Sequence, residues 1–188
     1  MLYSRVDVLH ALKRGSLKII PFDEKNLQPN NYVLHLDNEI ALAKTGKVDP
    51  LTTKNFEQYY DKRVLKNREK LVLQPGAFAL ARTREKIALG KKIGAFVDGK
   101  TTLARLGLSV VNAMLIHTGH GVPVPRKVVL ELHNSGPFEI VLTEGMPICS
   151  LIAFELKTES NVAYDSAGQY GLRQDKDSLF PLKEVFKY

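Results

Sequence analysis

The chain has 188 residues, of which 44% are hydrophobic and 25% are charged. This length and composition predict one globular domain with a substantial core and room for an appended arm. The single cysteine, Cys149, excludes an intrachain disulfide and a cysteine-based zinc cluster and favours a reducing, cytoplasmic location. No apolar run approaches the roughly 20 residues of a membrane span, and residues 1–15 lack a signal-peptide core, so we expect neither membrane insertion nor export.

Lysine and arginine outnumber aspartate and glutamate by 27 to 20, which gives a formal net charge of +7. The positive charges are spread along the chain and tryptophan is absent, so a nucleic-acid surface is not indicated. A small polyanion such as a nucleoside triphosphate explains the surplus equally well.

The chain opens with a predicted helix. Ser4 and Asp7 form a capping-box-like start, and Gly15 supplies the stop. One face of this helix carries Val8, Leu9 and Leu12. Residues 17–20 then predict a short strand that ends at Pro21.

Residues 28–43 have the alternation of strands, with a first run around Leu34 and a second around Ile40. From 44 to 70 this pattern is lost, and the segment is charged and interrupted by turn residues. We interpret 44–70 as an insertion that is partly helical at most. A solvated loop is the favoured interpretation, and an aromatic lip for a neighbouring subunit, formed by Phe56, Tyr59 and Tyr60, is the alternative.

Beyond the insertion, short apolar segments alternate with glycine and proline turns, beginning with two strands around Pro75 and Gly76. Further strands are predicted over 92–99, 106–115, 127–134, 138–143 and 146–156. This spacing indicates an all-β sandwich or barrel-like roll with short helices. The β domain is predicted over 1–157, and 158–188 is predicted to be an arm anchored by Tyr164, Phe180 and Phe186.

A Gly-Lys-Thr-Thr turn at 99–102 offers close backbone approach, hydroxyl groups and one positive charge, which suit an anionic ligand. A single helical turn is predicted after it. Residues 94–101 also satisfy the P-loop expression, but the predicted helix breaks at Gly107, whereas a P-loop needs a long helix. We therefore reject the P-loop interpretation.

Glu131 lies in an otherwise apolar predicted strand, on the face opposite Leu130 and Leu132. It is either an outward-facing solvated residue or a carboxylate that pairs with a cation and transfers protons. Arg105 is the natural partner for such a pair. His117 and His120 have H-x-x-H spacing, but without a third ligand nearby a solvent-exposed loop is favoured over a metal site.

Three stretches, DGKTTLARLGLSV, VVLELHNSG and TEGMPICSLIAFEL, resemble the dCTP deaminase branch of the dUTPase superfamily. The opening helix, IIPFD, QPNNYVLHLDNEI, LQPGAFALARTREKIAL and the aromatic-rich arm occur in the order of that family. The resemblance implies a distorted β-barrel or jelly-roll that assembles as a homotrimer with active sites between subunits. It also implies conversion of dCTP to dUTP and ammonia. A dUTP pyrophosphatase, a bifunctional deaminase and pyrophosphatase, and a non-catalytic nucleotide-binding protein are the alternatives.

The resemblance also implies roles for individual residues. Glu131 would activate water without zinc, and Arg105 would orient it. The Ala113 carbonyl and the Thr101 hydroxyl would hold the water and the exocyclic amine, while Lys100, Thr101 and Thr102 would bind phosphates carrying Mg²⁺. The residues of the arm that would close over the nucleotide are Tyr164, Gln169, Arg173 and Gln174.

Three positions depart from the pattern of the family. His117 stands where the family has an acidic residue, in a loop that is longer than usual. Val33 replaces the aspartate of an early Tyr-Asp pair, and Gln169 replaces the lysine of a Lys-Tyr pair in the arm.

Overall fold

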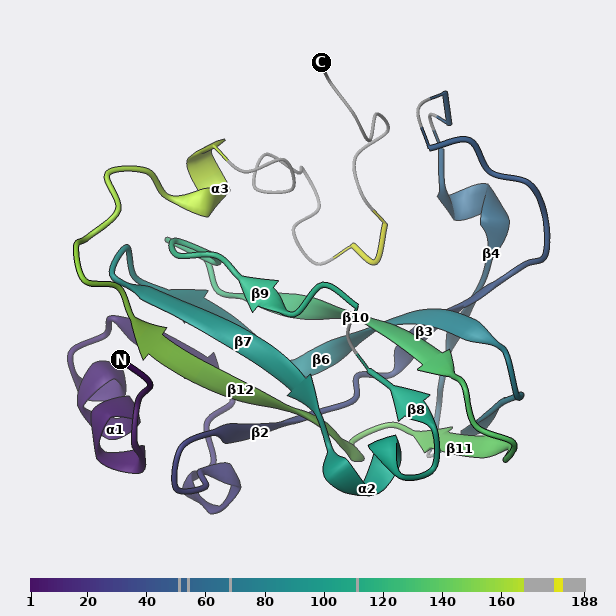
Figure 1. Ribbon diagram of the computed structural model, residues 1–188, viewed down its shortest axis with the longest axis horizontal. Helices are drawn as coiled ribbons and strands as arrows, with labels where there is room; N and C mark the ends of the chain where they lie inside the picture. Colours follow the sequence, from purple (N-terminus) through teal and green to yellow (C-terminus); the bar gives the residue numbers. More distant parts are fainter. Residues whose placement is uncertain (51, 54, 68, 111, 168–177, 181–188) are drawn as a thin grey trace.

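The computed structural model describes residues 1–188 apart from 51, 54, 68, 111, 168–177 and 181–188 (Figure 1). Strands dominate the described residues, and the helices are short. The helices are α1 (Arg5–Lys13), η1 (Glu24–Asn26), η2 (Glu57–Tyr59), α2 (Thr101–Ala104) and α3 (Tyr164–Ala167). The strands are β1 (Leu17–Ile20), β2 (Tyr32–His35), β3 (Glu39–Ala43), β4 (Tyr60–Val64), β5 (Lys70–Leu73), β6 (Phe78–Leu89), β7 (Ile93–Gly99), β8 (Leu108–Ser109), β9 (Leu115–Ile116), β10 (Arg126–Asn134), β11 (Ile140–Thr143) and β12 (Pro147–Glu155).

The strands of the described residues form three sheets (Figure 1). The largest sheet has the order β4-β3-β6-β10-β8, and β1 also pairs with β6. A second sheet has the order β2-β12-β7-β9, and β11 pairs with β5 in the third. One core holds buried side chains from both larger sheets, such as Ile87 and Leu130 from the first and Leu34 and Leu151 from the second. The two larger sheets therefore pack against each other, as in the predicted all-β roll.

The predicted opening helix is confirmed. The Ser4 hydroxyl accepts a hydrogen bond from the Asp7 amide at 3.3 Å, and the Asp7 carboxylate accepts one from the Ser4 amide at 2.9 Å. This reciprocal capping box satisfies two donors at the helix start. The helix ends before Gly15, whose φ of 71° suits the left-handed conformation of a helix C-terminus.

Most predicted strands are present, but the strand predicted over 106–115 is not. Among the described residues of this range only Leu108–Ser109 and Leu115–Ile116 belong to strands, and these two strands lie in different sheets. The residues between them leave β10 and approach β7, so the chain changes sheets within one apolar run. Local alternation cannot reveal such a change, because both ends of the run are apolar.

The prediction for 44–70 is also corrected. The strand β4 pairs with β3 along its whole length, from Glu39 opposite Val64 to Ala43 opposite Tyr60. Phe56 and Tyr60 belong to a small group of packed side chains, here called the outer cluster. These contacts stabilise β4, whose own sequence is charged. The outer cluster has a buried part, Ala41, Leu80, Leu179 and Phe180, and a partly buried part, Phe56, Tyr60, Phe78 and Val129.

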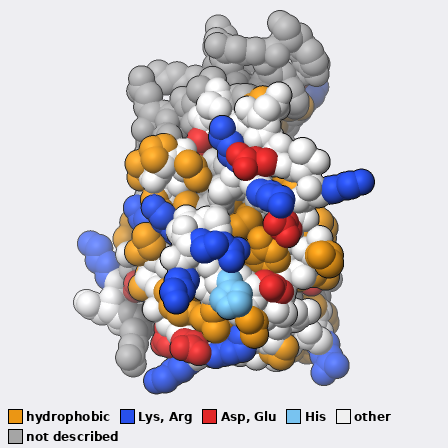
Figure 2. Space-filling view, turned by 90° about the vertical axis from the view of Figure 1, so that its left-hand side faces the viewer, with side chains coloured by type: hydrophobic (Ala, Val, Ile, Leu, Met, Phe, Trp, Pro, Cys, Tyr) orange, Lys and Arg blue, Asp and Glu red, His pale blue; other side chains and the backbone are white. Residues whose placement is uncertain are grey.

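The Gly-Lys-Thr-Thr turn leads into one helical turn, α2, as predicted. Its preceding strand, β7, is antiparallel to β12 and to β9, which is not the setting of a P-loop. No helix among the described residues has both the length and the apolar character needed to cross a membrane. Figure 2 shows lysine and arginine side chains interspersed with acidic and hydrophobic ones on the face toward the left of Figure 1.

Candidate functional site

Glu131 lies in the middle of β10, opposite Leu80 of β6. Its neighbours Leu130 and Leu132 are fully buried in the core, whereas Glu131 is half-buried on the other face. Its Oε2 accepts hydrogen bonds from the backbone amides of Asn112 and Ala113, at 3.0 and 3.1 Å. A carboxylate that accepts two backbone hydrogen bonds has a fixed orientation. Glu131 is therefore held in place and is not a freely solvated strand residue.

Arg105 follows α2 as its C-cap, and its side chain is exposed. Within the described part of the chain no ion pair joins Arg105 to Glu131. The pair that the resemblance implies is therefore not made inside one chain, and it stays a prediction for an assembly.

The candidate phosphate-binding turn is anchored to the end of β10. Its Lys100 is half-buried at the N-cap of α2, and Thr101 and Thr102 are exposed. The carbonyl of Gly107 accepts hydrogen bonds from the Ser135 amide and hydroxyl, both at 2.9 Å. This contact fixes the exposed Gly-Lys-Thr-Thr turn relative to the strand that carries Glu131.

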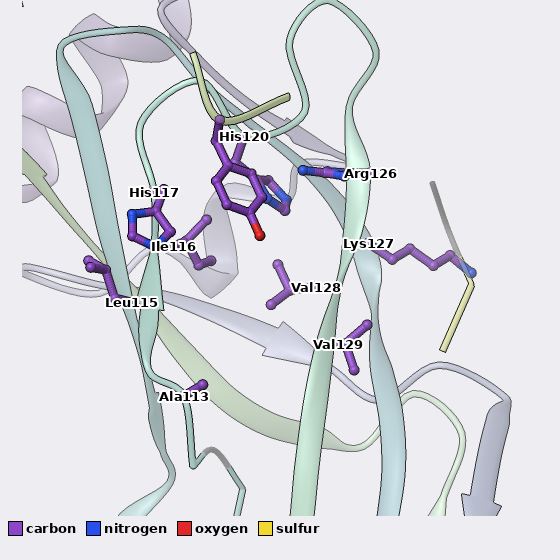
Figure 3. A pocket seen from close by; sticks show the side chains of 10 residues that line it. Ala113, Leu115, Ile116, His117, His120, Arg126, Lys127, Val128 and Val129 are labelled. Carbon is purple, nitrogen blue, oxygen red and sulfur yellow. The ribbon is translucent and has the colours of Figure 1, made fainter. Parts of the chain in front are cut away.

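A cavity of about 130 Å³ lies between β9, the loop that follows it and the first half of β10 (Figure 3). Figure 3 shows His117 and Ile116 on one side and Val128 and Val129 on the other, with Ala113 at one end. The lining comprises Ala113, Leu115, Ile116, His117, His120, Arg126, Lys127, Val128, Val129 and Tyr164. Because Ala113 donates to Glu131, the cavity and the held carboxylate adjoin each other.

The start of the arm packs on this cavity. The Tyr164 ring stacks on His117 with 5.1 Å between ring centroids and 13° between ring planes. The Arg126 guanidinium lies 5.5 Å from the centroid of the Tyr164 ring and forms a buried ion pair with Asp165. The Tyr164 amide also donates to the Thr118 carbonyl at 3.0 Å. Tyr164 thus lies at the cavity, whereas Gln169, Arg173, Gln174 and Phe186 lie outside the described residues.

Sequence reasoning missed the contribution of the loop histidines and of Arg126. The prediction of exposure holds for His117, but its ring contacts Tyr164, and the His120 ring centroid lies 6.4 Å from that of Tyr164. The H-x-x-H spacing of His117 and His120 was the sequence signal that could have indicated that this loop contributes to the site. No group of three or more His, Cys, Asp or Glu side chains that could hold a metal ion occurs among the described residues.

Lys127 points away from the cavity in Figure 3. Its Nζ lies 2.5 Å from Oδ2 of Asp37, and the same oxygen lies 2.6 Å from Nε of Arg82, which also contacts Glu39. Burial by itself raises the pKa of Asp37, but the hydrogen bonds from Lys127 and Arg82 outweigh it and hold the pKa below its ordinary value. This charged group ties β10 to β6 and to the loop after β2.

Comparison with known proteins identifies the chain. A family model described as dCTP deaminase-like matches residues 2–156. The chain belongs to the dCTP deaminase-like family. This confirms the resemblance drawn from the central motifs.

Two relatives of this dCTP deaminase-like chain illustrate the match. A dUMP-forming dCTP deaminase of Hydrogenobaculum sp. is 33% identical over 162 residues, covering 83% of each chain. A dCTP deaminase of Haloarcula marismortui is 30% identical over 172 residues, covering 87% of this chain and 85% of the relative.

The fold is similar to that of a solved 2'-deoxycytidine 5'-triphosphate deaminase from Agrobacterium tumefaciens, with a TM-score of 0.61 and 17% sequence identity. The match covers 81% of this chain and 47% of that chain, so this chain spans less than half of the solved one. The predicted all-β roll with short helices is confirmed.

Proposed function

We propose that this protein is a dCTP deaminase that converts dCTP and water to dUTP and ammonia. Glu131 takes a proton from water as the water oxygen bonds to C4 of cytosine. The carboxyl group gives that proton to the ring nitrogen N3, then takes the proton of the new C4 hydroxyl and passes it to the exocyclic amine as C4=O forms. The C4–N bond breaks and ammonia leaves, so one carboxylate serves first as general base and then as general acid.

The observation that carries this proposal is the fixed carboxylate of Glu131 beside a cavity. Two backbone amides orient one of its oxygens, at 3.0 and 3.1 Å. The adjoining cavity has apolar walls, including Ile116 and Val129, and ends at Ala113, whose carbonyl we assign to the water and the amine. A pyrimidine ring needs such apolar walls together with a few fixed polar groups.

The triphosphate would bind at the other exposed element, through the Lys100 ammonium and the Thr101 and Thr102 hydroxyls. A lysine and two hydroxyl groups suit phosphate oxygens, whereas the described residues contain no cluster of metal ligands. Mg²⁺ would therefore arrive as part of the nucleotide complex and be held by its phosphates.

A homotrimer would complete the site. Arg105, Thr101 and Thr102 are exposed in the single chain. Among the described residues no ion pair joins Arg105 to Glu131. Contact with a neighbouring copy would bring an arginine to the carboxylate and bury the turn. The arm, 158–188, would then close over the nucleotide from Tyr164 onward, with Gln169, Arg173 and Gln174 as further contacts. We place the enzyme in the cytoplasm because its lone cysteine, Cys149, is a free, buried thiol.

A bifunctional enzyme that releases dUMP is the second candidate. The name of the Hydrogenobaculum relative, a dUMP-forming dCTP deaminase, favours it. Against it, His117 occupies the loop position at which the resemblance calls for an acid, and cleavage of dUTP needs a carboxylate to position water. A non-catalytic nucleotide-binding protein is favoured by the same departure, together with Val33.

Separate assays of ammonia and pyrophosphate test these candidates, with Mg²⁺ and either dCTP or dUTP as substrate. Ammonia without pyrophosphate supports the deaminase, both products support the bifunctional enzyme, and pyrophosphate from dUTP alone supports a pyrophosphatase. Binding without either product supports the non-catalytic protein.

Glu131→Gln should lower ammonia release by at least about 100-fold, the scale of a lost general base, while nucleotide binding is retained. The matched control is Glu139→Gln, which changes an exposed glutamate beyond the end of β10. Deamination that persists in Glu131→Gln would remove Glu131 from its role.

A further inference from the structure

The sheet face that bears Glu131 continues across four strands. The register places Glu131 of β10 opposite Leu80 of β6, Leu80 opposite Ala41 of β3, and Ala41 opposite Lys62 of β4. Residues directly opposite each other on neighbouring strands project to the same side of a sheet. Glu131 and Lys62 are therefore the two ends of one row of side chains.

The C-terminal segment 178–180 covers the middle of this row. In Figure 1 it is the yellow piece that lies above β10, between α3 and β4. Leu179 is 2% exposed and Phe180 is 6% exposed, and both belong to the outer cluster with Ala41 and Leu80. Val129, two residues before Glu131 on the same face, packs on this cluster. The segment thus lies on the face of the sheet from which Glu131 projects.

The insertion supplies the contact that holds this segment. The Tyr60 and Phe180 rings meet edge to face, with 5.2 Å between centroids and 62° between planes. The Lys62 ammonium lies 4.8 Å from the centroid of the Phe180 ring. It also lies 2.5 Å from a carboxylate oxygen of Glu57. Edge-to-face aromatic pairs and cation–π contacts both stabilise docked aromatic residues. Phe180 is thus held by residues of the 44–70 insertion.

Tyr60 projects from the same face of the sheet as Lys62 and Glu131, because it lies two residues before Lys62 on β4. Burial raises the pKa of Tyr60, and the negative charge of Glu131 raises it further. The raised pKa keeps the Tyr60 hydroxyl protonated at neutral pH. The insertion and the C-terminal segment are therefore in contact with each other on the sheet face that bears the carboxylate.

We propose that Tyr60 and Phe180 form a clasp that holds the C-terminal segment over the Glu131 face and positions this carboxylate for proton transfer. Both are positioning residues, since they act through Glu131. The clasp gives the insertion a function, because it provides the docking site for the segment 178–180. The effect on reaction rate rests on the proposed deamination, whereas the docking itself does not.

The chain contains no tryptophan, so the fluorescence of one introduced tryptophan can report docking of the segment 178–180 without substrate. Phe180→Trp introduces a single reporter, and docking predicts blue-shifted emission that is poorly quenched by acrylamide. Adding Tyr60→Ala should shift the emission to longer wavelength and increase quenching. The control is Val64→Ala, which shortens a half-exposed side chain on the same strand but outside the outer cluster. If Phe180→Trp fails to fold, Tyr60→Trp with Phe180→Ala tests the same contact from the other side.

The reaction supplies the second readout. Tyr60→Ala and Phe180→Ala should each lower kcat for dCTP deamination by about 3- to 10-fold, the scale of one aromatic pair. The KM for dCTP should change less, because the clasp lies on the Glu131 face and away from the phosphate turn. The double variant should lose little more than either single variant, since each ring acts through the other. Phe180→Tyr should restore activity.

Exposed-type emission in Phe180→Trp alone would overturn the docking. Emission that responds to Tyr60→Ala while kcat is unchanged would overturn the positioning role. If the unaltered protein deaminates no nucleotide, the proposed function fails, and the emission still decides whether the clasp exists.

Discussion

The amide nitrogen of Ala113 lies 3.1 Å from Oε2 of Glu131, and the two residues are 18 positions apart in the chain. This hydrogen bond joins the loop between β8 and β9 to the centre of β10. Since the Asn112 amide binds the same oxygen, the loop fixes one side of the carboxylate.

Ala113→Pro removes one of these two donors. A hydrogen bond to a charged group contributes about 1.5–3 kcal/mol, so deamination should fall by about 10- to 100-fold. Ala113→Gly keeps the amide and is the matched control. Ammonia release measures the effect, and calorimetry with dCTP checks that the nucleotide still binds. Equal activity of the proline and glycine variants would contradict the role of this amide.

The ion pair of Arg126 and Asp165 should hold the start of the arm on the cavity. Both side chains are 4% exposed, so Asp165→Asn removes one partner of a buried ion pair and should destabilise the docked arm by about 3 kcal/mol. Hydrogen exchange of the Tyr164 amide, which donates to the Thr118 carbonyl, reports on docking. Exchange should accelerate in Asp165→Asn, recover partly in the apolar pair Arg126→Met with Asp165→Leu, and stay unchanged in Glu159→Gln.

The contact of Gly107 with Gly136 should tolerate no side chain. A Cβ at position 107, where φ is 90°, would lie 2.3 Å from the Gly136 Cα. Gly107→Ala should therefore cost roughly 2–4 kcal/mol of unfolding free energy, combining a steric clash with an unfavourable φ. Gly76 has a φ of 77° and no atom within 4 Å of a Cβ, so Gly76→Ala should cost about 1 kcal/mol. Equal losses in urea unfolding would show that the clash is relieved elsewhere.

The Asp37 group should make stability depend on pH in the acid range. The folded-state pKa of Asp37 lies below its ordinary value of 3.8, so its contribution is present above 3.8 and is lost as pH falls through the folded value. The difference in stability between the wild type and Asp37→Asn should therefore be constant near neutral pH and shrink below 3.8. Urea unfolding at a series of pH values measures it. Asp61→Asn, at an exposed ion pair with Lys44, should show a small difference throughout.

Local sequence determined much of the fold. Ser4 and Asp7 predicted the first helix, and the alternation around Glu131 predicted both its strand and the face on which it lies. The Gly-Lys-Thr-Thr turn predicted a single helical turn. These features depend on neighbours in the chain, which is why capping, period and turn chemistry were sufficient.

Tertiary structure decided the rest. The charged residues of β4 form a strand because they pair with β3, and Tyr60 at the start of β4 packs on Phe180, which lies far away in the sequence. The two amides on Glu131 and the stacking of His117 on Tyr164 likewise join segments that no local pattern connects. The sequence alone indicated Glu131 as the candidate carboxylate and indicated the family. The amide donors and aromatic rings around the site are brought together only by the tertiary structure, because contacts between distant segments form only when the sheets pack.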